Sequence, residues 1–134
     1  MALTVELVSP EEIAYEGEAD SVIARTVGGG DIAFLDGHTP FIGTLSVWEV
    51  KLLSAGQART FAVHRGFVEV TGSKVIVLSD IAEAKEDIDV ERARQAKAKA
   101  EQAVSANEED AEAVAALQRA KVRLHVSGAE PLVN

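Results

Sequence analysis

The side chains best suited to catalysis are three histidines, which lie far apart in the chain. They are His38, His64 and His125, and none has a spacing such as H-E-x-x-H, which places two imidazoles on one metal ion. The sequence also contains no cysteine, no G-x-S-x-G nucleophile motif and no glycine-rich Walker loop. A small hydrolase that uses His38 or His64 with a carboxylate is disfavoured, because no activated nucleophile accompanies either ring. We expect no catalytic residues and no metal site.

Two loop segments have ordinary structural interpretations. The segment His38-Thr39-Pro40 follows an apolar run at residues 32–35 and the turn Asp36-Gly37. A lone loop histidine usually bonds to nearby backbone, and the local sequence favours that interpretation. The triple glycine at residues 28–30 precedes a short strand rather than a helix, so it lacks the helix N-terminus that binds phosphate. It is typical of a flexible turn.

Length and charge limit the kinds of partner. The 134 residues suffice for one ordinary domain, or for one small domain with an appendage. The net charge of −9 opposes nonspecific binding to nucleic acid or to an anionic membrane surface. The first residues lack the pattern of a secretion signal, and no stretch approaches the ~20 apolar residues that a spanning helix needs. We expect a cytoplasmic protein.

The amino-acid composition of the sequence changes near Asp80. Nine of the ten glycines and all six aromatic residues precede this position, whereas residues 73–127 contain neither glycine nor proline and are rich in alanine. Before Asp80, β-branched runs such as residues 3–7 and 47–52 alternate with turn signals, and Gly72-Ser73 is expected to join residues 67–70 to 75–78 as a hairpin. This half is predicted to form an antiparallel β-sandwich or barrel.

The second half has the pattern of two helices. The first is expected to begin near Asp87 or Ile88, where acidic residues meet the positive end of the helix dipole, and to run to about Ala106. A polar turn at residues 105–110 precedes the second helix, which Gly128 ends. The predicted fold class is β + α, in which an N-terminal antiparallel β-sandwich (residues 1–84) precedes a C-terminal two-helix antiparallel hairpin (residues 85–134).

The predicted seam of the hairpin contains mostly small side chains. On the first helix the apolar stripe is Ala93, Ala96, Ala100 and Ala103, and on the second it is Val114, Leu117, Ala120 and Leu124. A buried methyl contributes only ~0.8 kcal/mol, against ~1.5–3 kcal/mol for a fully buried leucine, so the helices should be weakly held. Two hypotheses stay open, namely a thin helical appendage and a movable element that changes partners.

Four segments, in the same chain order, resemble motifs of ATP synthase epsilon subunits. They are residues 30–40 (GDIAFLDGHTP, beside G-[DE]-I-G-x-L-P-G-H-x-P), 65–70 (RGFVEV, beside G-G-F-x-E-V), 77–83 (VLSDIAE, beside V-L-A-D-x-A-E) and 87–93 (DIDVERA, beside D-I-D-x-x-R-A). Ala33, Asp36 and Arg65 depart from the motifs at positions where the family has glycine, proline and glycine. The ordered set spans nearly the whole chain, so these departures question local turns and not the family.

The resemblance implies a non-catalytic subunit in the central stalk of a rotary, proton-translocating F-type ATP synthase. Its sandwich would contact the gamma subunit and the polar loops of the membrane c-ring, and these proteins would hold it at the cytoplasmic face of the bacterial membrane. By position, Asp31 matches the family's acidic residue that faces the c-ring, and His38 matches its histidine near gamma. An acid beside polar loops suggests charge pairing across a modest interface.

The resemblance also implies a regulatory hairpin. The family's hairpin can extend toward the alpha and beta subunits and hinder ATP hydrolysis, and here Arg119 and Arg123 would meet an acidic region of beta. No cofactor is required, but some bacterial members bind ATP as a regulatory ligand. The residues that match or extend that ATP motif are Glu83, Ile88, Asp89, Arg92, Ala93, Lys99, Arg119 and Arg123.

One alternative to the nucleotide-binding role and one to the stalk function remain. Asp89 and Arg92 stand three residues apart on one helical face, so a plain ion pair at a helix start, worth ~0.2–0.5 kcal/mol, explains the motif without ATP. Conversely, a free-standing regulatory module could sense ATP through residues 83–123 and signal through the sandwich. Such a module would not copurify with a membrane complex, whereas a stalk subunit would.

Overall fold

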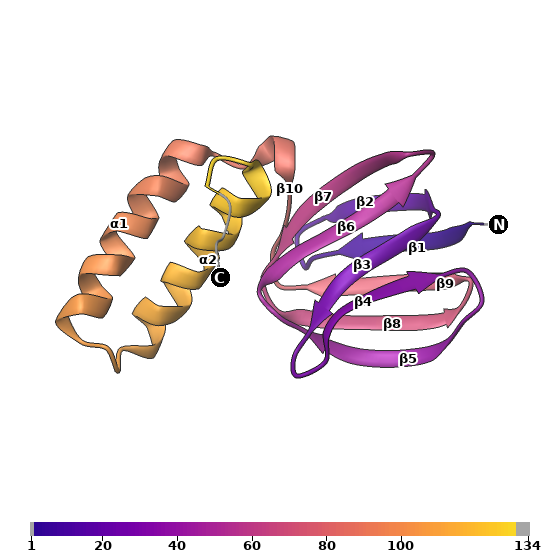
Figure 1. Cartoon of the computed structure of the whole chain (residues 1–134), viewed down its shortest axis with the longest axis horizontal. Coiled ribbons are helices and arrows are strands. Elements are labelled where there is room, and N and C mark those ends of the chain that lie inside the picture. The colour runs from indigo at the N-terminus through magenta and orange to yellow at the C-terminus, as the bar shows by residue number, and fades with distance from the viewer. Residues whose placement is uncertain (1, 131–134) are drawn as a thin grey trace. The chain divides into compact units, whose positions relative to one another are not determined.

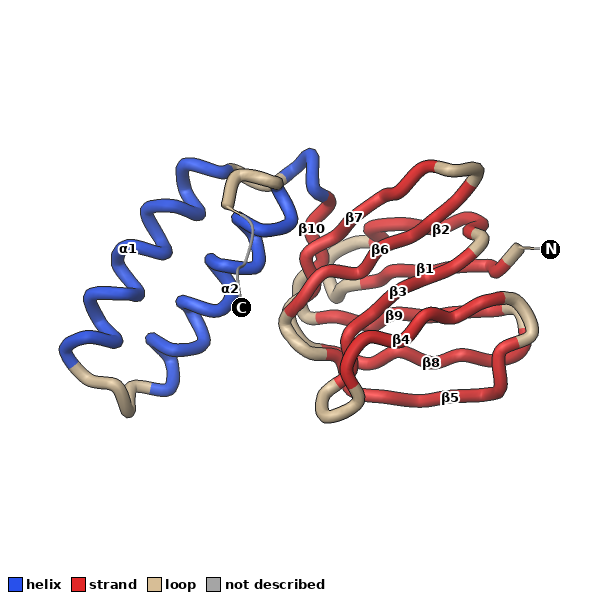
Figure 2. The backbone as a smooth tube through the Cα atoms, in the orientation of Figure 1, coloured by secondary structure: helices blue, strands red, loops and turns tan. Residues whose placement is uncertain are grey.

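The structure is a computed structural model in which residues 2–130 are described. The chain divides into two compact units between Ala84 and Lys85, and each unit has its own secondary structure. The first unit consists of strands and the second of helices, as the backbone tube in Figure 2 shows. Residues 131–134 of the predicted hairpin region lie outside the described residues.

The first unit is a hydrogen-bonded sheet of ten strands, which folds over into two layers (Figure 1). One layer contains β10 (Ala82–Ala84), β7 (Gln57–Val63), β6 (Trp48–Ser54), β3 (Ser21–Thr26) and β4 (Gly30–Leu35). The other contains β5 (His38–Leu45), β8 (Gly66–Gly72), β9 (Lys74–Ser79), β1 (Leu3–Val8) and β2 (Ile13–Ala19). The layers join where β3 meets β5 at a single residue pair, Thr26 with Leu45. The predicted β-sandwich is confirmed.

The strand pairs are antiparallel with one difference from the prediction. The β8–β9 hairpin turns at Gly72-Ser73 as expected, with Thr71 paired to Lys74. However, β1 pairs with β9 in parallel over five residue pairs, from Thr4 with Lys74 to Val8 with Leu78. A parallel pair requires a long crossover, which the intervening strands supply, so local alternation in the sequence does not reveal it.

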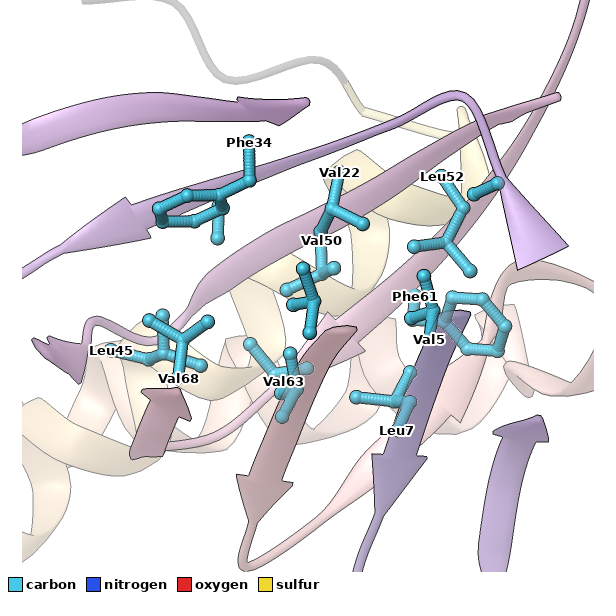
Figure 3. Close-up of a cluster of buried hydrophobic side chains, with 14 of the residues drawn as sticks. Val5, Leu7, Val22, Phe34, Leu45, Val50, Leu52, Phe61, Val63 and Val68 are labelled. Carbon is cyan, nitrogen blue, oxygen red and sulfur yellow. The ribbon is translucent and has the colours of Figure 1, made fainter. Parts of the chain in front are cut away.

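The core of the sandwich lies between the two layers. Figure 3 shows Val22, Phe34, Val50 and Leu52 from one layer pointing toward Val5, Leu7, Leu45 and Val68 from the other. All eight side chains are buried to within 1% exposure. Because successive residues of a strand face opposite sides of the sheet, their neighbours in each strand form the outer surface. That outer surface carries the candidate docking residues.

The second unit is a hairpin of α1 (Val90–Ala106) and α2 (Ala111–Ser127), preceded by the 3-10 turn η1 (Lys85–Asp87). An aspartate caps each helix: Asp89 accepts a hydrogen bond from the backbone N–H of Arg92, and Asp110 accepts one from that of Ala113. The first helix therefore begins a few residues later than expected, because Asp89 is its cap. Gly128 ends α2 with φ at 85°, as glycine permits.

The seam of the hairpin is shifted from the predicted positions. Ala93, Ala100, Ala120 and Leu124 are buried as expected, but Ala96 is exposed and Val114 is 46% exposed. Ala103 and Leu117 are half-buried. Lys97 takes the place of Ala96, and Ala113 takes the place of Val114. The less exposed positions are spaced by four and then three residues along each helix, starting from Ala93 and from Ala113. Val122 and Val126 of α2 are also buried.

Candidate functional site

The three histidines do not form a cluster. His38 begins β5, where its Nδ1 lies 2.6 Å from the carbonyl oxygen of Thr39 and its ring packs edge-on against Phe34 at a centroid distance of 5.0 Å. His125 lies in α2, in the other unit. Within residues 2–130, no group of three or more histidine, aspartate and glutamate side chains has the arrangement of a metal site. The backbone contact of His38 matches its structural interpretation.

His64 is a buried histidine with a structural partner. Its side chain is 3% exposed, and its Nε2 lies 3.2 Å from Oε1 of Glu83 in β10. Its backbone N–H donates to the hydroxyl of Ser79, which lies 2.8 Å from the carbonyl oxygens of Arg65 and Ile81. Glu83, a candidate ATP contact, thus belongs to the sandwich unit and helps to hold the end of β7.

Asp31 lies in a cluster of side chains from β3, β4 and β6. It is directly opposite Arg25 in the strand register, and its two carboxylate oxygens accept from Nε and Nη2 of Arg25 at 2.8 and 3.3 Å. The guanidinium carbon of Arg25 also lies 3.9 Å from the ring centroid of Trp48. Oε2 of Glu49 lies 3.7 Å from Nζ of Lys51, and both residues line a hollow together with Asp31 and Trp48. We call Arg25, Asp31, Trp48, Glu49 and Lys51 the Asp31 cluster.

The hydrogen bonds between Arg25 and Asp31 shift the pKa of both side chains. The hydrogen bonds from Arg25 lower the pKa of Asp31 below its ordinary value, against a smaller opposing effect of burial. The same bonds raise the pKa of Arg25. Because the folded pKa of Asp31 is depressed, the pair contributes stability above the unfolded pKa of about 4 and loses it as pH falls through the folded pKa. The side chains are 37% and 51% exposed, so solvent screens this contribution.

Asp31 and His38 are separate features of the sandwich. Asp31 bonds to Arg25, whereas His38 contacts Thr39 and Phe34. In the described part of the chain, no hydrogen bond or ion pair joins the two side chains.

An exposed apolar surface on β5, β8 and β9 was not predicted. Ile42, Phe67 and Leu78 are 72%, 56% and 51% exposed, and Phe67 is directly opposite Leu78 in the strand register. A hollow beside this pair is lined by Val8 and Pro10. The signal in the sequence was the unbroken apolar run at residues 75–78, which places apolar side chains on both faces of β9. We call Ile42, Phe67 and Leu78 the apolar surface; such surfaces commonly mark protein contacts.

The candidate ATP residues come from or adjoin three elements, β10, α1 and α2. Ile88, Asp89, Arg92 and Ala93 lie together at the start of α1, but Ile88 and Ala93 are buried and Asp89 is used as the helix cap. Lys99 lies further along α1 and is exposed. Asp89 is thus a helix-start residue, but it acts through the backbone N–H of Arg92. Among residues 2–130 no ion pair joins the two side chains, so the predicted ion pair is not formed.

The candidate beta contacts lie on α2. Arg119 donates to Glu112 at 3.0 Å, and Arg123 is half-buried. Across the hairpin, Nζ of Lys97 in α1 lies 2.6 Å from Oε1 of Glu130, just beyond α2. This hydrogen bond raises the pKa of Lys97 and lowers that of Glu130. The hairpin is therefore held by a partly buried ion pair as well as by its seam.

Among residues 2–130, neither helix has the length and apolar character required to cross a membrane.

Comparison with protein families assigns both units of the chain. Residues 2–85 match the beta-sandwich domain of the ATP synthase delta/epsilon chain, and residues 86–128 match its long alpha-helix domain. The ATP synthase epsilon chain of Thermobifida fusca is 45% identical over 133 residues, which cover 96% of this chain and 93% of that one. The epsilon chain of Halalkalibacterium halodurans is 41% identical over 130 residues, covering 94% and 97%.

Solved structures show the same fold. A chain in the cryo-EM structure of the Euglena gracilis mitochondrial ATP synthase, described as OSCP/F1/c-ring, superposes with a TM-score of 0.70 at 19% identity and covers 96% of this chain and 78% of that chain. A chain from the central stalk and c-ring of the Tetrahymena thermophila enzyme gives a TM-score of 0.60 at 12% identity, covering 97% and 98%. The family resemblance of the four segments is thus confirmed, and the chain belongs to the ATP synthase delta/epsilon chain family.

Proposed function

We propose that this chain is a non-catalytic subunit of the central stalk of a bacterial, proton-translocating F-type ATP synthase. The observation that carries the proposal is the match of both units, in order and over more than nine-tenths of the chain, to bacterial ATP synthase epsilon chains.

The test of this proposal is copurification. A tagged copy of the chain, expressed from its own gene in its own cells, should bring down gamma, alpha, beta and the c-ring from detergent-solubilised membranes. Recovery of the chain alone, under conditions in which the ATP synthase stays assembled, would instead favour a free-standing ATP-sensing module.

The sandwich offers two surfaces that suit two rotor partners. The Asp31 cluster is polar and fits the polar loops of a c-ring, whereas the apolar surface has the character of a lasting protein contact and fits the gamma subunit. His38 begins β5, the strand that also carries Ile42, so a gamma contact that extends along this strand would reach the histidine. The net charge of −9 disfavours direct attachment to anionic lipid, so protein partners would place the chain at the cytoplasmic face of the membrane.

The hairpin is the proposed regulator of ATP hydrolysis. It is a compact unit by itself, and much of its seam is alanine, so opening it exposes little apolar surface. Arg119 would have to leave Glu112 to meet an acidic partner, and an exposed pair of this kind contributes only about 0–1 kcal/mol. Exchange of partners is therefore energetically accessible.

Neutralising Arg119 and Arg123 together should relieve inhibition of ATP hydrolysis by about twofold to tenfold, because one or two charge-assisted contacts to beta would be lost. The measurement is the steady-state hydrolysis rate of the enzyme reconstituted with R119Q/R123Q. K121Q, which removes one positive charge from the same helix between the two arginines, is the control and should leave inhibition intact. Equal rates with the double variant and the native chain would contradict the proposed contact.

ATP binding by the hairpin stays a prediction, and we expect it to be weak. The carboxylate of Asp89 already accepts the N–H of Arg92, so binding of a nucleotide amino group would compete with the helix cap. Titration calorimetry of the full chain with ATP, and with GTP as the control base, measures it directly. Tight, ATP-selective binding would show that the start of α1 rearranges around the nucleotide.

A further inference from the structure

We propose that Arg25 is a positioning residue for Asp31, and that the Asp31 cluster docks as an electrically neutral array of donors and acceptors on a polar protein loop. The inference rests on the proposed function in that it assumes that Asp31 faces a rotor partner. It departs from the expectation of charge pairing, because it assigns recognition to hydrogen bonds with peptide groups and not to a free carboxylate.

The first step is the geometry of the pair. Arg25 and Asp31 are opposite residues on β3 and β4, and two parallel hydrogen bonds join the guanidinium to both carboxylate oxygens. Trp48 supplies a third constraint, since its ring lies against the guanidinium at 3.9 Å. A guanidinium that is both bidentate and stacked fixes the plane of its carboxylate, and lysine cannot reproduce this arrangement.

The second step is the position of β4 in the sheet. Strand β4 pairs with β3 and lies outside the continuous series of paired strands. Asp31 is half-exposed on this strand, so the direction of its carboxylate depends on what the side chain contacts. Arg25 provides those contacts and thereby reduces the conformational entropy that Asp31 would lose on docking.

The third step is the balance of charge. Arg25 pairs with Asp31, and Lys51 lies 3.7 Å from Glu49, so the cluster contains two cations and two anions in two ion pairs. Its charge sums to zero on a chain whose net charge is −9. A neutral cluster does not attract a lysine or arginine from a distance as an isolated carboxylate would.

The fourth step is the remaining hydrogen-bonding capacity. A guanidinium has five N–H donors and a carboxylate has about four acceptor sites, of which the pair uses two each. Donors and acceptors thus remain side by side at one exposed place. Peptide groups in a polar loop present the complementary carbonyl and N–H, so a loop with unpaired backbone groups is the chemical class of partner that fits.

The experiment measures binding of the full chain to ATP synthase membranes from which this subunit has been removed. We expect R25Q and R25K each to weaken binding about tenfold, or ~1.4 kcal/mol, and D31N to weaken it similarly. R59Q, which removes the same charge elsewhere on the sandwich, should bind as the native chain does. Affinity of the native chain should change less than about threefold between ~0.1 and ~0.5 M salt, because no net charge is paired.

The variants separate this inference from the proposed function. If D31N weakens binding but R25Q binds as tightly as the native chain or more tightly, Asp31 acts as a free anion and the inference fails alone. If R25K binds normally, Arg25 supplies only charge and the positioning role fails. If D31N has no effect, the assumed rotor contact of Asp31 is itself wrong. The urea unfolding midpoint of each variant, followed by fluorescence of Trp48, the single tryptophan, reports whether the sandwich stays folded.

Discussion

Replacing Gly66 with alanine should destabilise the sandwich by about 3 kcal/mol or more, which is a large part of the ~5–15 kcal/mol that stabilises a typical domain. Gly66 has a φ of 142° and is paired with Ser79 across β8 and β9. A Cβ at this position would lie 1.9 Å from the carbonyl oxygen of Leu78 and 2.8 Å from the Cα of Ser79. These are backbone atoms, so the strands must separate. Urea unfolding followed by Trp48 fluorescence measures the loss.

Gly72 offers a matched control for this prediction. Its φ of 59° is also positive, but an added Cβ would meet nothing within 4 Å. G72A should therefore cost only about 1–2 kcal/mol, from backbone strain alone. Because Gly66 adjoins Phe67, G66A should also reduce binding of the chain to gamma. Equal unfolding midpoints for G66A and G72A would show that the close approach to Leu78 is not limiting.

Replacing Leu124 with alanine should loosen the hairpin and leave the sandwich intact. Leu124 is a fully buried large side chain of the hairpin seam, whose other buried members are mostly alanines. Truncating a buried leucine costs ~2–5 kcal/mol, so amide exchange through opening of α1 and α2 should accelerate at least about thirtyfold. Hydrogen exchange of the full chain, resolved by residue, measures this acceleration.

The control for the hairpin prediction is V114A. Val114 is on the same helix but is 46% exposed, so its truncation should change the stability of the hairpin by less than about 0.5 kcal/mol. In the L124A variant the amides of β3, β6 and β8 should keep their native exchange rates. If these strands lose protection together with the helices, the hairpin does not open independently and its proposed regulatory movement would need another explanation.

Much of the fold could be predicted from the sequence because local signals agree with it. The alternation at residues 3–7 and the turn at Gly72-Ser73 lie where the strands and hairpin require them. The acidic residues expected at the start of the first helix include Asp89, which caps it, and Asp110, at the end of the predicted polar turn, caps the second. The departures from family motifs are tolerated locally: Ala33 faces outward on β4, and Arg65 takes a φ of 62°, a conformation more usual for glycine.

What the sequence did not reveal depends on contacts between distant segments. The parallel β1–β9 pair joins residues some 70 positions apart, and no local pattern encodes it. The seam of the hairpin was predicted one residue away at Ala96 and Val114, since alanine-rich helices offer several similar stripes. Asp31 was identified by resemblance alone, but its bonds to Arg25 and the ring of Trp48 emerge only when β3, β4 and β6 are assembled.

The most direct test of the proposed stalk function is a cryo-EM structure of the ATP synthase purified through a tag on this chain. We expect the sandwich on the rotor, with the Asp31 cluster within hydrogen-bonding distance of the c-ring loops and with Phe67 and Leu78 covered by gamma. A structure in which the chain lies away from the rotor, or in which both surfaces remain open to solvent, would contradict the proposal.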